Sequence, residues 1–396
     1  MRLRFFNTYE PVSPFYRDLI PKLLDEGHEI EMLISSAEYR QGRTPLRQVL
    51  DDDRVRIRQM PCGVKTADAR WKKLWASFTY VVGTMLVTLL GRGSDLNFFL
   101  TQPPLFQIWG RVLKLIRRQP YSCLLMDIYP DVAVSNGLMR EGAVATRIMK
   151  WISRSTLQHA QNVVVIGRCM QSLLENDGVD PKRIMLIPNW ANENEIRRLD
   201  KDQNPFRSEL GLQDHLVCLY SGNIGVSHRF DEWLEVILQL SKHEEIKFVF
   251  IGSGSRKAEI ESFCETHRLN NVLLLPYQPT EKLSEGLGLG DLHFVSLRDE
   301  FVGKVVPSKA YGALVAGKPI IYQGRPEGEI ARIILEHELG FVVDEGDVES
   351  LKLAVLNCFE DRNRLQELSE NAHRVSQELY SREAAVEKYA QLFAEP

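Results

Sequence analysis

The segment LVCLYSGNIG, residues 216–225, decides the fold expected for the second half of the chain. It joins a short apolar run, typical of a strand, to a turn with two glycines, and the pattern recurs in FVFIGSG, residues 248–254. A third small-residue turn, VPSK at residues 306–309, precedes the helix-like stretch 310–316. Glycine lets backbone amides approach a ligand closely, and the first turn of a helix offers unpaired N–H groups to an anion. Three such turns on one parallel sheet predict a crevice that binds a diphosphate.

Outward from this segment, strand-like and helix-like stretches alternate along the whole chain. The helix expected at 15–26 ends at Gly27, a typical C-terminal cap, and Asp231 is the expected cap of a helix at 231–242. Such alternation predicts α/β domains with parallel sheets covered on both faces, and 396 residues suffice for two of them. The polar stretch 190–211 is the expected linker. The predicted strands are 3–6, 29–34, 55–59, 96–100, 121–126, 162–166, 184–187, 216–220, 246–251, 272–275, 292–295, 319–322 and 341–343.

Composition narrows the functional classes. The chain is 44% hydrophobic and 26% charged, as in ordinary soluble globular proteins, and its net charge of −4 does not favour nucleic acid as a partner. Six cysteines are scattered without the spacing of a zinc site, so we expect a reducing compartment and no metal. The opening residues Met1–Phe6 have the pattern of a strand rather than of a signal peptide. These features predict a cytoplasmic protein.

One uncharged stretch, residues 74–91, is long enough to reach the lower limit for a membrane span. Because it contains Gly83, Tyr80 and several hydroxyl residues, we expect a buried or membrane-dipping helix instead. A second apolar helix, expected at 106–116, carries basic residues. These either rest the first domain on anionic lipid at the inner face of the plasma membrane or form the solvated face of a surface helix. The basic residues are Arg111, Lys114, Arg117 and Arg118.

The motifs together resemble the retaining GT-B glycosyltransferases of family four, in particular the branch that builds bacterial surface polysaccharides. They comprise, in order, GHE at 27–29, DIYPD at 127–131, IPNW at 187–190, the NxG, GxG and PSK turns, and AGKP at 316–319. The resemblance implies two doubly wound Rossmann-like domains that face a cleft. Residues 1–195 would bind the acceptor and residues 205–375 the nucleotide-sugar, while a helix in 376–396 would pack back on the first domain.

The donor residues are expected in the three turns. The backbone of Gly222, Asn223 and Gly225 would contact the diphosphate, unless this turn only links strand to helix. Lys309 would neutralise the leaving phosphate, with Ser308 capping the helix behind Val306 and Pro307; the alternative for Lys309 is a solvated surface lysine. Gly252 and Gly254 would let the chain pass close to the nucleoside, or form a simple turn.

Further donor contacts follow from the resemblance. The loop with Tyr277 and Gln278 resembles the family's base-binding loop, although Tyr277 is equally well an ordinary half-buried aromatic. Glu300 would meet the sugar hydroxyls. Gly312 stands where many members have a second glutamate, and Asn223 and His228 replace the usual arginine and lysine of the diphosphate site. Positive charge must then come from Lys309 or from two further residues, Lys304 and Arg229.

The acceptor side offers Asp127, which follows a predicted strand and would orient the acceptor hydroxyl or the transferred sugar. Its alternative role is a helix cap or turn residue beside Pro130. The resemblance implies a metal-independent, retaining transferase that needs no cofactor. It would move a hexose or N-acetylhexosamine from a nucleotide donor, taken as UDP-linked, to a lipid-linked or glycan acceptor. A sugar-nucleotide epimerase of the same architecture and a non-catalytic paralogue are the alternatives.

Overall fold

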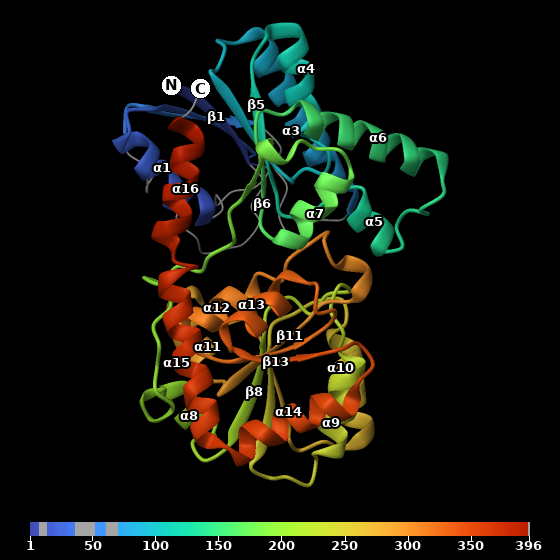
Figure 1. The fold of residues 1–396 in the computed structure, drawn as a ribbon, viewed down its shortest axis with the longest axis vertical. Helices are drawn as coiled ribbons and strands as arrows, with labels where there is room; N and C mark the ends of the chain where they lie inside the picture. The colour runs from blue at the N-terminus through green and yellow to red at the C-terminus, as the bar shows by residue number, and fades with distance from the viewer. Residues whose placement is uncertain (8–13, 36–51, 61–69, 395–396) are drawn as a thin grey trace. The chain divides into compact units, whose positions relative to one another are not determined.

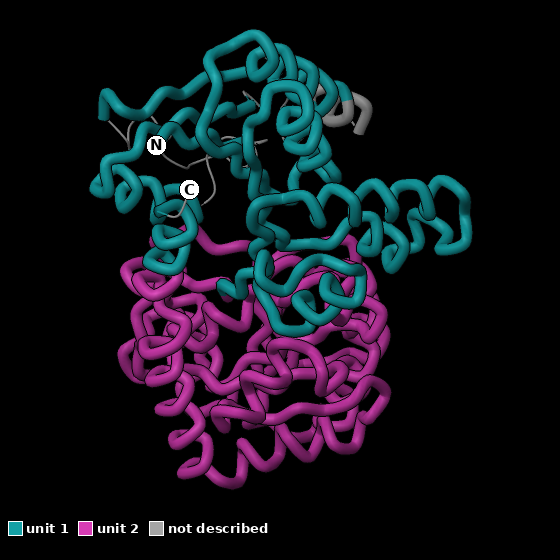
Figure 2. Tube along the Cα trace, turned by 45° about the horizontal axis from the view of Figure 1, so that its top comes forward, with its two compact units in different colours: residues 1–187, 386–396 teal, residues 188–385 magenta. Residues whose placement is uncertain are grey.

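A computed structural model of the chain describes residues 1–7, 14–35, 52–60 and 70–394. It divides into two compact units, one formed by Met1–Ile187 with Val386–Pro396 and the other by Pro188–Ala385 (Figure 2). Each unit is built on one parallel sheet with helices packed against it (Figure 1). The prediction of two doubly wound α/β domains is therefore confirmed.

The first unit contains a seven-stranded sheet in the order β3-β2-β1-β4-β5-β6-β7. The chain moves from β1 to one edge and then crosses to β4 and runs to the other edge, which is the winding of a Rossmann-like sheet. Neighbouring strands are parallel, with Leu3 opposite Ile30 on one side and Leu96 on the other. The strands are β1 Arg2–Asn7, β2 Glu29–Ser35, β3 Val55–Met60, β4 Leu96–Leu100, β5 Tyr121–Leu125, β6 Val163–Val165 and β7 Ile184–Leu186.

Helices of the first unit include one that is distant in sequence. The helix α16, Arg382–Ala394, lies beside α1, and most of it belongs to this unit (Figure 1). Its Phe393 ring lies 5.2 Å from Phe98, and its Tyr389 ring lies 4.9 Å from Phe15. The late helix therefore completes the first core. The others are α1 Pro14–Asp25, α3 Arg70–Leu90, α4 Ile108–Arg117, α5 Asp131–Ser135, α6 Val144–His159, α7 Arg168–Asn176 and the 3-10 turn η1 Pro181–Arg183.

The second unit contains a six-stranded parallel sheet in the order β10-β9-β8-β11-β12-β13. Its strands are β8 Leu216–Ser221, β9 Ile246–Ile251, β10 Val272–Leu275, β11 Leu292–Ser296, β12 Ile320–Gln323 and β13 Gly340–Val343. Its helices are α8 Pro205–Glu209, α9 Asp231–Gln239, α10 Lys257–His267, α11 Leu283–Gly288, α12 Lys309–Val315, α13 Glu329–His337, α14 Val348–Glu360 and α15 Arg362–Glu378. Three 3-10 turns join them, η2 Lys201–Gln203, η3 Thr280–Lys282 and η4 Asp299–Phe301.

Both faces of the second sheet are buried because side chains alternate along each strand. On β8, Cys218 points into the core formed with α9 and α14, whereas Leu219 points into a smaller core with Phe206 of α8. Trp233 of α9 stacks on Phe294 of β11 with ring centroids 4.1 Å apart. This two-sided burial holds the strands that end at the candidate site.

The predicted elements agree with the described ones, and the differences lie at caps and connections. Each predicted strand overlaps a strand of the structure within the described residues. Asp231 was expected to cap its helix, but it is the first helical residue and its carboxylate pairs with Arg256 at 3.2 Å. The expected linker 190–211 is partly ordered structure, since it contains η2 and α8 and buries Phe206.

The uncharged segment 74–91 lies within α3. No helix among the described residues meets the criteria of length and apolarity for a membrane span. One side of α3 is buried at Tyr80, Thr84 and Thr88, while the opposite side exposes apolar side chains. Those exposed residues are Trp75, Phe78, Val82, Leu86, Leu89 and Leu90.

Basic residues of the neighbouring α4 bond to the carboxyl ends of other helices. The Arg117 guanidinium donates to the carbonyls of Leu89 and Gly91 at the end of α3. The Lys114 ammonium donates to the carbonyl of His159 at the end of α6, and Arg111 donates to Ser155 in the same helix. Unpaired carbonyls and the negative end of the dipole favour a cation at these positions. Three of the four basic side chains therefore serve as caps, a role that the sequence had not indicated.

Candidate functional site

The predicted donor residues lie in loops that follow neighbouring strands of the second sheet. The strands β10, β9, β8 and β11 are adjacent in that order, and parallel strands present their carboxyl ends at one edge, where ligands of open α/β sheets bind. The loop residues are Tyr277 and Gln278 after β10, Gly252 and Gly254 after β9, Gly222, Asn223, Gly225 and Arg229 after β8, and Glu300, Lys304, Val306, Pro307, Ser308 and Lys309 after β11.

The two glycine turns pack directly on each other. The Ile224 amide donates to the Ser253 carbonyl at 3.0 Å. A Cβ at Gly252 would lie 2.0 Å from the Gly222 oxygen, and a Cβ at Gly254 would lie 2.2 Å from the Ile224 oxygen. Glycine is therefore required at both positions of the second turn by the backbone of the first turn, independently of any nucleoside.

This packing decides which amides remain for an anion. The Gly222 amide donates to Ile251 at 2.9 Å and the Gly252 amide donates to Leu275 at 3.0 Å, so neither is available. Within the described ranges, the amides of Asn223, Gly225 and Gly254 make no hydrogen bond. These three N–H groups are the main-chain donors that the turns leave for a ligand.

Lys309, the first residue of α12, reaches across to β8. Its ammonium donates to the Tyr220 hydroxyl and lies 3.1 Å from Nε2 of His228. Its Cε is 3.5 Å from the position that a Cβ would take at Gly222. The Tyr220 hydroxyl in turn donates to the Asn223 carbonyl at 2.7 Å. One lysine therefore joins the PSK turn to the NxG turn.

Hydrogen bonds and burial set the charge state of this cluster. The His228 Nδ1–H donates to the Ser296 carbonyl, which leaves Nε2 as the acceptor that faces Lys309. Burial, and then the nearby Lys309, lower the pKa of His228 to about 3, so this imidazole is neutral at pH 7. Burial also lowers the pKa of Lys309 well below its usual range. A bound anion would oppose that shift, because it favours the charged ammonium.

Arg229 is held by other partners. Its guanidinium pairs with Glu232, which is 5% exposed, and with Glu345 at 2.5 Å. Glu345 also accepts from the Asp299 amide at 3.0 Å. These contacts fix the loops after β8, β11 and β13 to one another. Arg229 is therefore already paired with two carboxylates of the protein, and Lys309 is the cation better placed to contact a bound diphosphate.

The loop after β11 places Glu300 and Lys304 close together. The Glu300 carboxylate pairs with Arg298 at 2.7 Å, and the Lys304 ammonium donates to the Glu300 carbonyl at 2.7 Å. Ser308 is at the cap position of α12 but makes no capping hydrogen bond. Its φ of −63° and ψ of −20° are helical rather than extended, so Oγ is not directed at the following amides. The expected Ser308 cap is absent.

The loop after β10 presents an aromatic surface. Tyr277 is 44% exposed, and its hydroxyl lies 3.5 Å from the Ser253 carbonyl of the GxG turn. The Gln278 side chain turns back to the Pro276 carbonyl at 2.9 Å. Tyr277 is therefore a partly exposed aromatic residue beside the second glycine turn, and aromatic rings in such positions can stack on a nucleobase.

Asp127 belongs to the first unit, where it follows β5. Its amide lies 3.4 Å from Oγ1 of Thr101, and its carboxylate has no ion pair among the described residues. Burial raises the pKa of Asp127 to about 6. The cap position of α5 is Pro130, so the cap role considered for Asp127 is wrong. A desolvated, unpaired carboxyl group is typical of a functional site.

Several members of the cluster were not expected from the sequence. Tyr220 lies in the segment 216–225 but was given no role, and Ser296, Glu232 and Glu345 were not singled out. The replacement of the usual lysine by His228 indicated that this position belongs to the site. Its contact with Lys309 could not be predicted, because the two residues are 81 positions apart in sequence and only the fold brings them together.

Comparisons with known proteins agree with this geometry. Residues 202–375 match the domain model for glycosyl transferases group 1, and residues 12–190 match that of a glycosyl transferase 4-like domain. The probable glycosyltransferase WbjE of Pseudomonas aeruginosa is 29% identical over 77% of this chain and 75% of its own. The putative colanic acid biosynthesis glycosyl transferase WcaI of Escherichia coli K12 is 23% identical over 81% and 82% of the two chains.

Solved structures share the fold. HepE of Anabaena, in complex with UDP and glucose, superposes over the full length of both chains with a TM-score of 0.73 at 14% identity. WaaG, a glycosyltransferase involved in lipopolysaccharide biosynthesis, does so with a TM-score of 0.68 at 14% identity.

Proposed function

Because this chain belongs to the glycosyltransferases, with a 4-like domain in its first half and a group 1 domain in its second, we propose that it transfers a sugar from a UDP-linked donor with retention at the anomeric carbon. The sugar would be an N-acetylated or deoxy hexose and the acceptor lipid-linked or a glycan, in surface polysaccharide synthesis. The names of two relatives, WcaI and the UDP-bound HepE, support this proposal. The observation that carries it is the position of the Lys309 ammonium beside the NxG turn.

The chemistry assigned to these residues is stabilisation of the leaving group. When the bond between the anomeric carbon and the β-phosphate oxygen breaks, negative charge develops on UDP. The Lys309 ammonium and the amides of Asn223, Gly225 and Gly254 would meet that charge, and such preorganised donors are the main source of catalysis in sites of this kind. The acceptor oxygen then forms the new bond on the same face, and its proton passes to the departing phosphate. Asp127 would orient the acceptor hydroxyl.

A peripheral membrane contact through the first unit is part of the proposal. Large apolar side chains are exposed along α3, where Trp75 is 67% exposed and Leu90 is 81% exposed. The end of α4 adjoins the end of α3 through Arg117, and Ile116 beside it is 64% exposed. Apolar patches of this kind mark interaction sites, and exposed Arg92 and Arg118 at the same ends suit an anionic bilayer. The enzyme would act on the cytoplasmic side of the membrane.

A donor assay with Lys309→Ala tests the transferase proposal. Purified protein is incubated with a panel of UDP-sugars, and UDP release is followed with and without EDTA. We expect slow hydrolysis by the native chain that is unchanged by EDTA, since an ammonium and amides would take the place of a metal. Lys309→Ala should lower the rate about 10²- to 10³-fold.

Lys257→Ala is the matched control, because this lysine of α10 pairs with Glu261, at 3.3 Å, and with no other acid in the described ranges. It should retain both the rate and the melting temperature. Interconversion of the donor sugar without UDP release would indicate an epimerase instead, and the absence of a thermal shift with UDP or any UDP-sugar would exclude donor binding. Unfolding of Lys309→Ala would show that the lysine is structural; the catalytic role is then tested with Lys309→Arg.

A further inference from the structure

A second pocket lies at the edge of the second sheet opposite the donor turns. It has a volume of about 550 Å³ and includes Asp291, just before β11, and Lys318, just before β12. The donor turns follow the carboxyl ends of β8, β9, β10 and β11, so the two regions lie at opposite ends of the parallel strands. Its remaining lining comes from the segment before α8 and from one side of α15, and includes Arg198, Asp200, Lys201, Gln203, Arg362 and Gln366.

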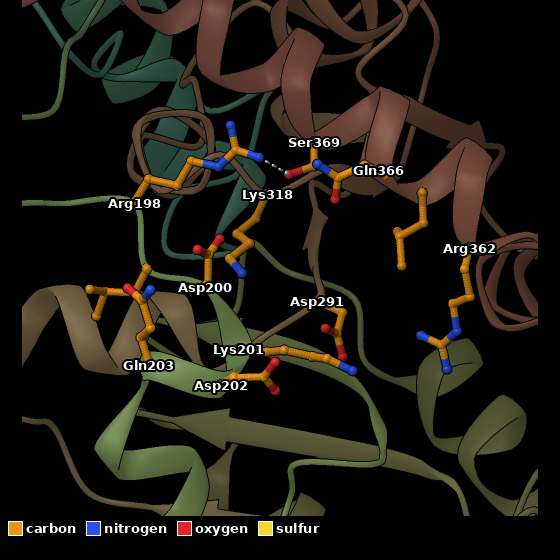
Figure 3. Close-up of a pocket in the computed structure, with 12 residues that line it drawn as sticks. Arg198, Asp200, Lys201, Asp202, Gln203, Asp291, Lys318, Arg362, Gln366 and Ser369 are labelled. Carbon is orange, nitrogen blue, oxygen red and sulfur yellow. Dashed lines mark hydrogen bonds between the residues drawn. The ribbon is translucent and has the colours of Figure 1, made fainter.

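Lys318 is the buried cation of this pocket. It is 8% exposed, and its ammonium makes no hydrogen bond or ion pair within the part of the chain that the structure describes. Figure 3 shows the side chain pointing into the space that Arg198, Lys201 and Arg362 border. A buried charge without an ion pair is unfavourable, so this arrangement favours the binding of an anion beside Lys318.

Asp291, an acidic residue of the same pocket, already has other partners. Asp291 accepts two hydrogen bonds of 2.9 Å from the fully buried Arg207 and a third of 2.8 Å from the Val217 amide. Its charge is therefore neutralised by Arg207 rather than by Lys318. Burial lowers the pKa of Lys318, with Arg207 and Arg198 acting in the same direction, and the attraction of Asp291 and Asp200 only partly opposes that shift.

Three further cations border the pocket, and none of them pairs with an acidic residue in the described part of the chain. Arg198 donates to the Ser369 hydroxyl at 3.4 Å, which leaves the rest of its guanidinium available (Figure 3). Gly317 has a φ of +66°, and a Cβ there would lie 3.0 Å from the Arg198 Cδ, so glycine makes room for this side chain. Arg362 stacks on the Phe359 ring, and Lys201 forms no ion pair within the described ranges.

We propose that this pocket binds a small phosphomonoester that carries hydroxyl groups, such as a sugar phosphate. Lys318 and Arg198 would bind the phosphate, since a guanidinium fork and an ammonium are its usual partners. The carboxylates of Asp200 and Asp202 and the amides of Gln203 and Gln366 stand around the same space and would accept from or donate to hydroxyls. Neither carboxylate forms an ion pair at hydrogen-bond distance among the described residues, and their negative charge disfavours a purely anionic ligand and favours one that has hydroxyls as well as a phosphate.

The test measures binding while the donor crevice is filled. With saturating UDP present, the native chain is titrated calorimetrically with glucose 1-phosphate, inorganic phosphate or glucose. We expect glucose 1-phosphate to bind, phosphate to bind at least tenfold more weakly, and glucose not to bind. Lys318→Met and Arg198→Ala should each weaken glucose 1-phosphate at least tenfold and leave the affinity for UDP unchanged. Lys309→Ala should keep the native affinity for glucose 1-phosphate.

A second readout separates a ligand-binding lysine from a structural one. Lys318→Met removes a buried charge that has no ion pair among the described residues, so its melting temperature should rise above that of the native chain. A lower melting temperature for Lys318→Met, competition between UDP and glucose 1-phosphate, or unchanged binding in both variants would overturn the proposal. Equal affinity for phosphate and glucose 1-phosphate would overturn the sugar part of it.

Discussion

At the scale of single residues, Asp127 gives the proposed reaction a pH dependence. Burial raises the pKa of its carboxyl to about 6, and the ionised form is the one that can accept a hydrogen bond from an acceptor hydroxyl. The rate at low substrate should therefore fall about tenfold per pH unit as the pH drops below 6. Asp127→Asn should be slow and should lose this acidic limb. A pH–rate profile of both proteins from pH 4.5 to 8.5 measures this.

Stability provides the control for the same substitution. A carboxyl whose pKa is higher in the folded than in the unfolded chain destabilises the fold once it is ionised, so its contribution falls as the pH rises from about 4 to about 6. Asp127→Asn should therefore resist urea better than the native chain at pH 8. A variant that is less stable at pH 8 and retains the acidic limb would contradict the assigned role.

The candidate cations show what a sequence can and cannot indicate about a site. Lys309 was singled out because it follows a Pro-Ser turn, and the structure places it beside the NxG turn. Arg229 was a further candidate in sequence, yet its partner Glu345 lies 116 residues away. Whether a cation is free or paired depends on such distant partners, and local sequence carries no record of them.

At the scale of elements, the packing of the two glycine turns predicts a large effect from one methyl group. Gly254→Ala would bring a Cβ to within 2.2 Å of the Ile224 carbonyl, so the turns must separate. We expect a loss of about 1–3 kcal/mol in the free energy of unfolding and weaker UDP binding. Urea denaturation and calorimetry measure the two effects.

Gly312→Ala is the matched control in the same unit. Gly312 is inside α12, and a Cβ there would make an ordinary 3.6 Å contact with Leu287. Because alanine favours a helix over glycine, this variant should be equally or more stable. If both variants behaved alike, close packing of the turns would not be the reason for glycine at position 254.

Elements were predicted better than their ends. Alternating apolar patterns identify buried strands because burial on both faces is a property of the whole segment, which is why β8 and β9 were found with nearly correct bounds. Caps depend on the φ and ψ of one residue. Ser308 and Asp231 have the right chemistry for caps, but the backbone puts one in a helical conformation and the other inside the helix.

At the scale of the whole molecule, the exposed apolar side of α3 predicts binding to a bilayer. Trp75→Ser and Leu90→Ser together should reduce sedimentation with phosphatidylglycerol-containing vesicles several-fold, without a change in melting temperature, because both side chains are exposed. Leu353→Ser on α14, which is 52% exposed, is the control and should sediment like the native chain. Equal sedimentation of all three proteins would exclude this surface as the contact.

The return of α16 to the first unit has a consequence for biosynthesis. Residues 386–394 follow the entire second unit in the chain, yet Tyr389 and Phe393 cover the aromatic side chains of Phe15 and Phe98. A nascent chain that has emerged only as far as residue 187 therefore still has an open hydrophobic surface on its first unit. The unit that is synthesised first therefore completes its core last, because α16 must first be synthesised and released from the ribosome.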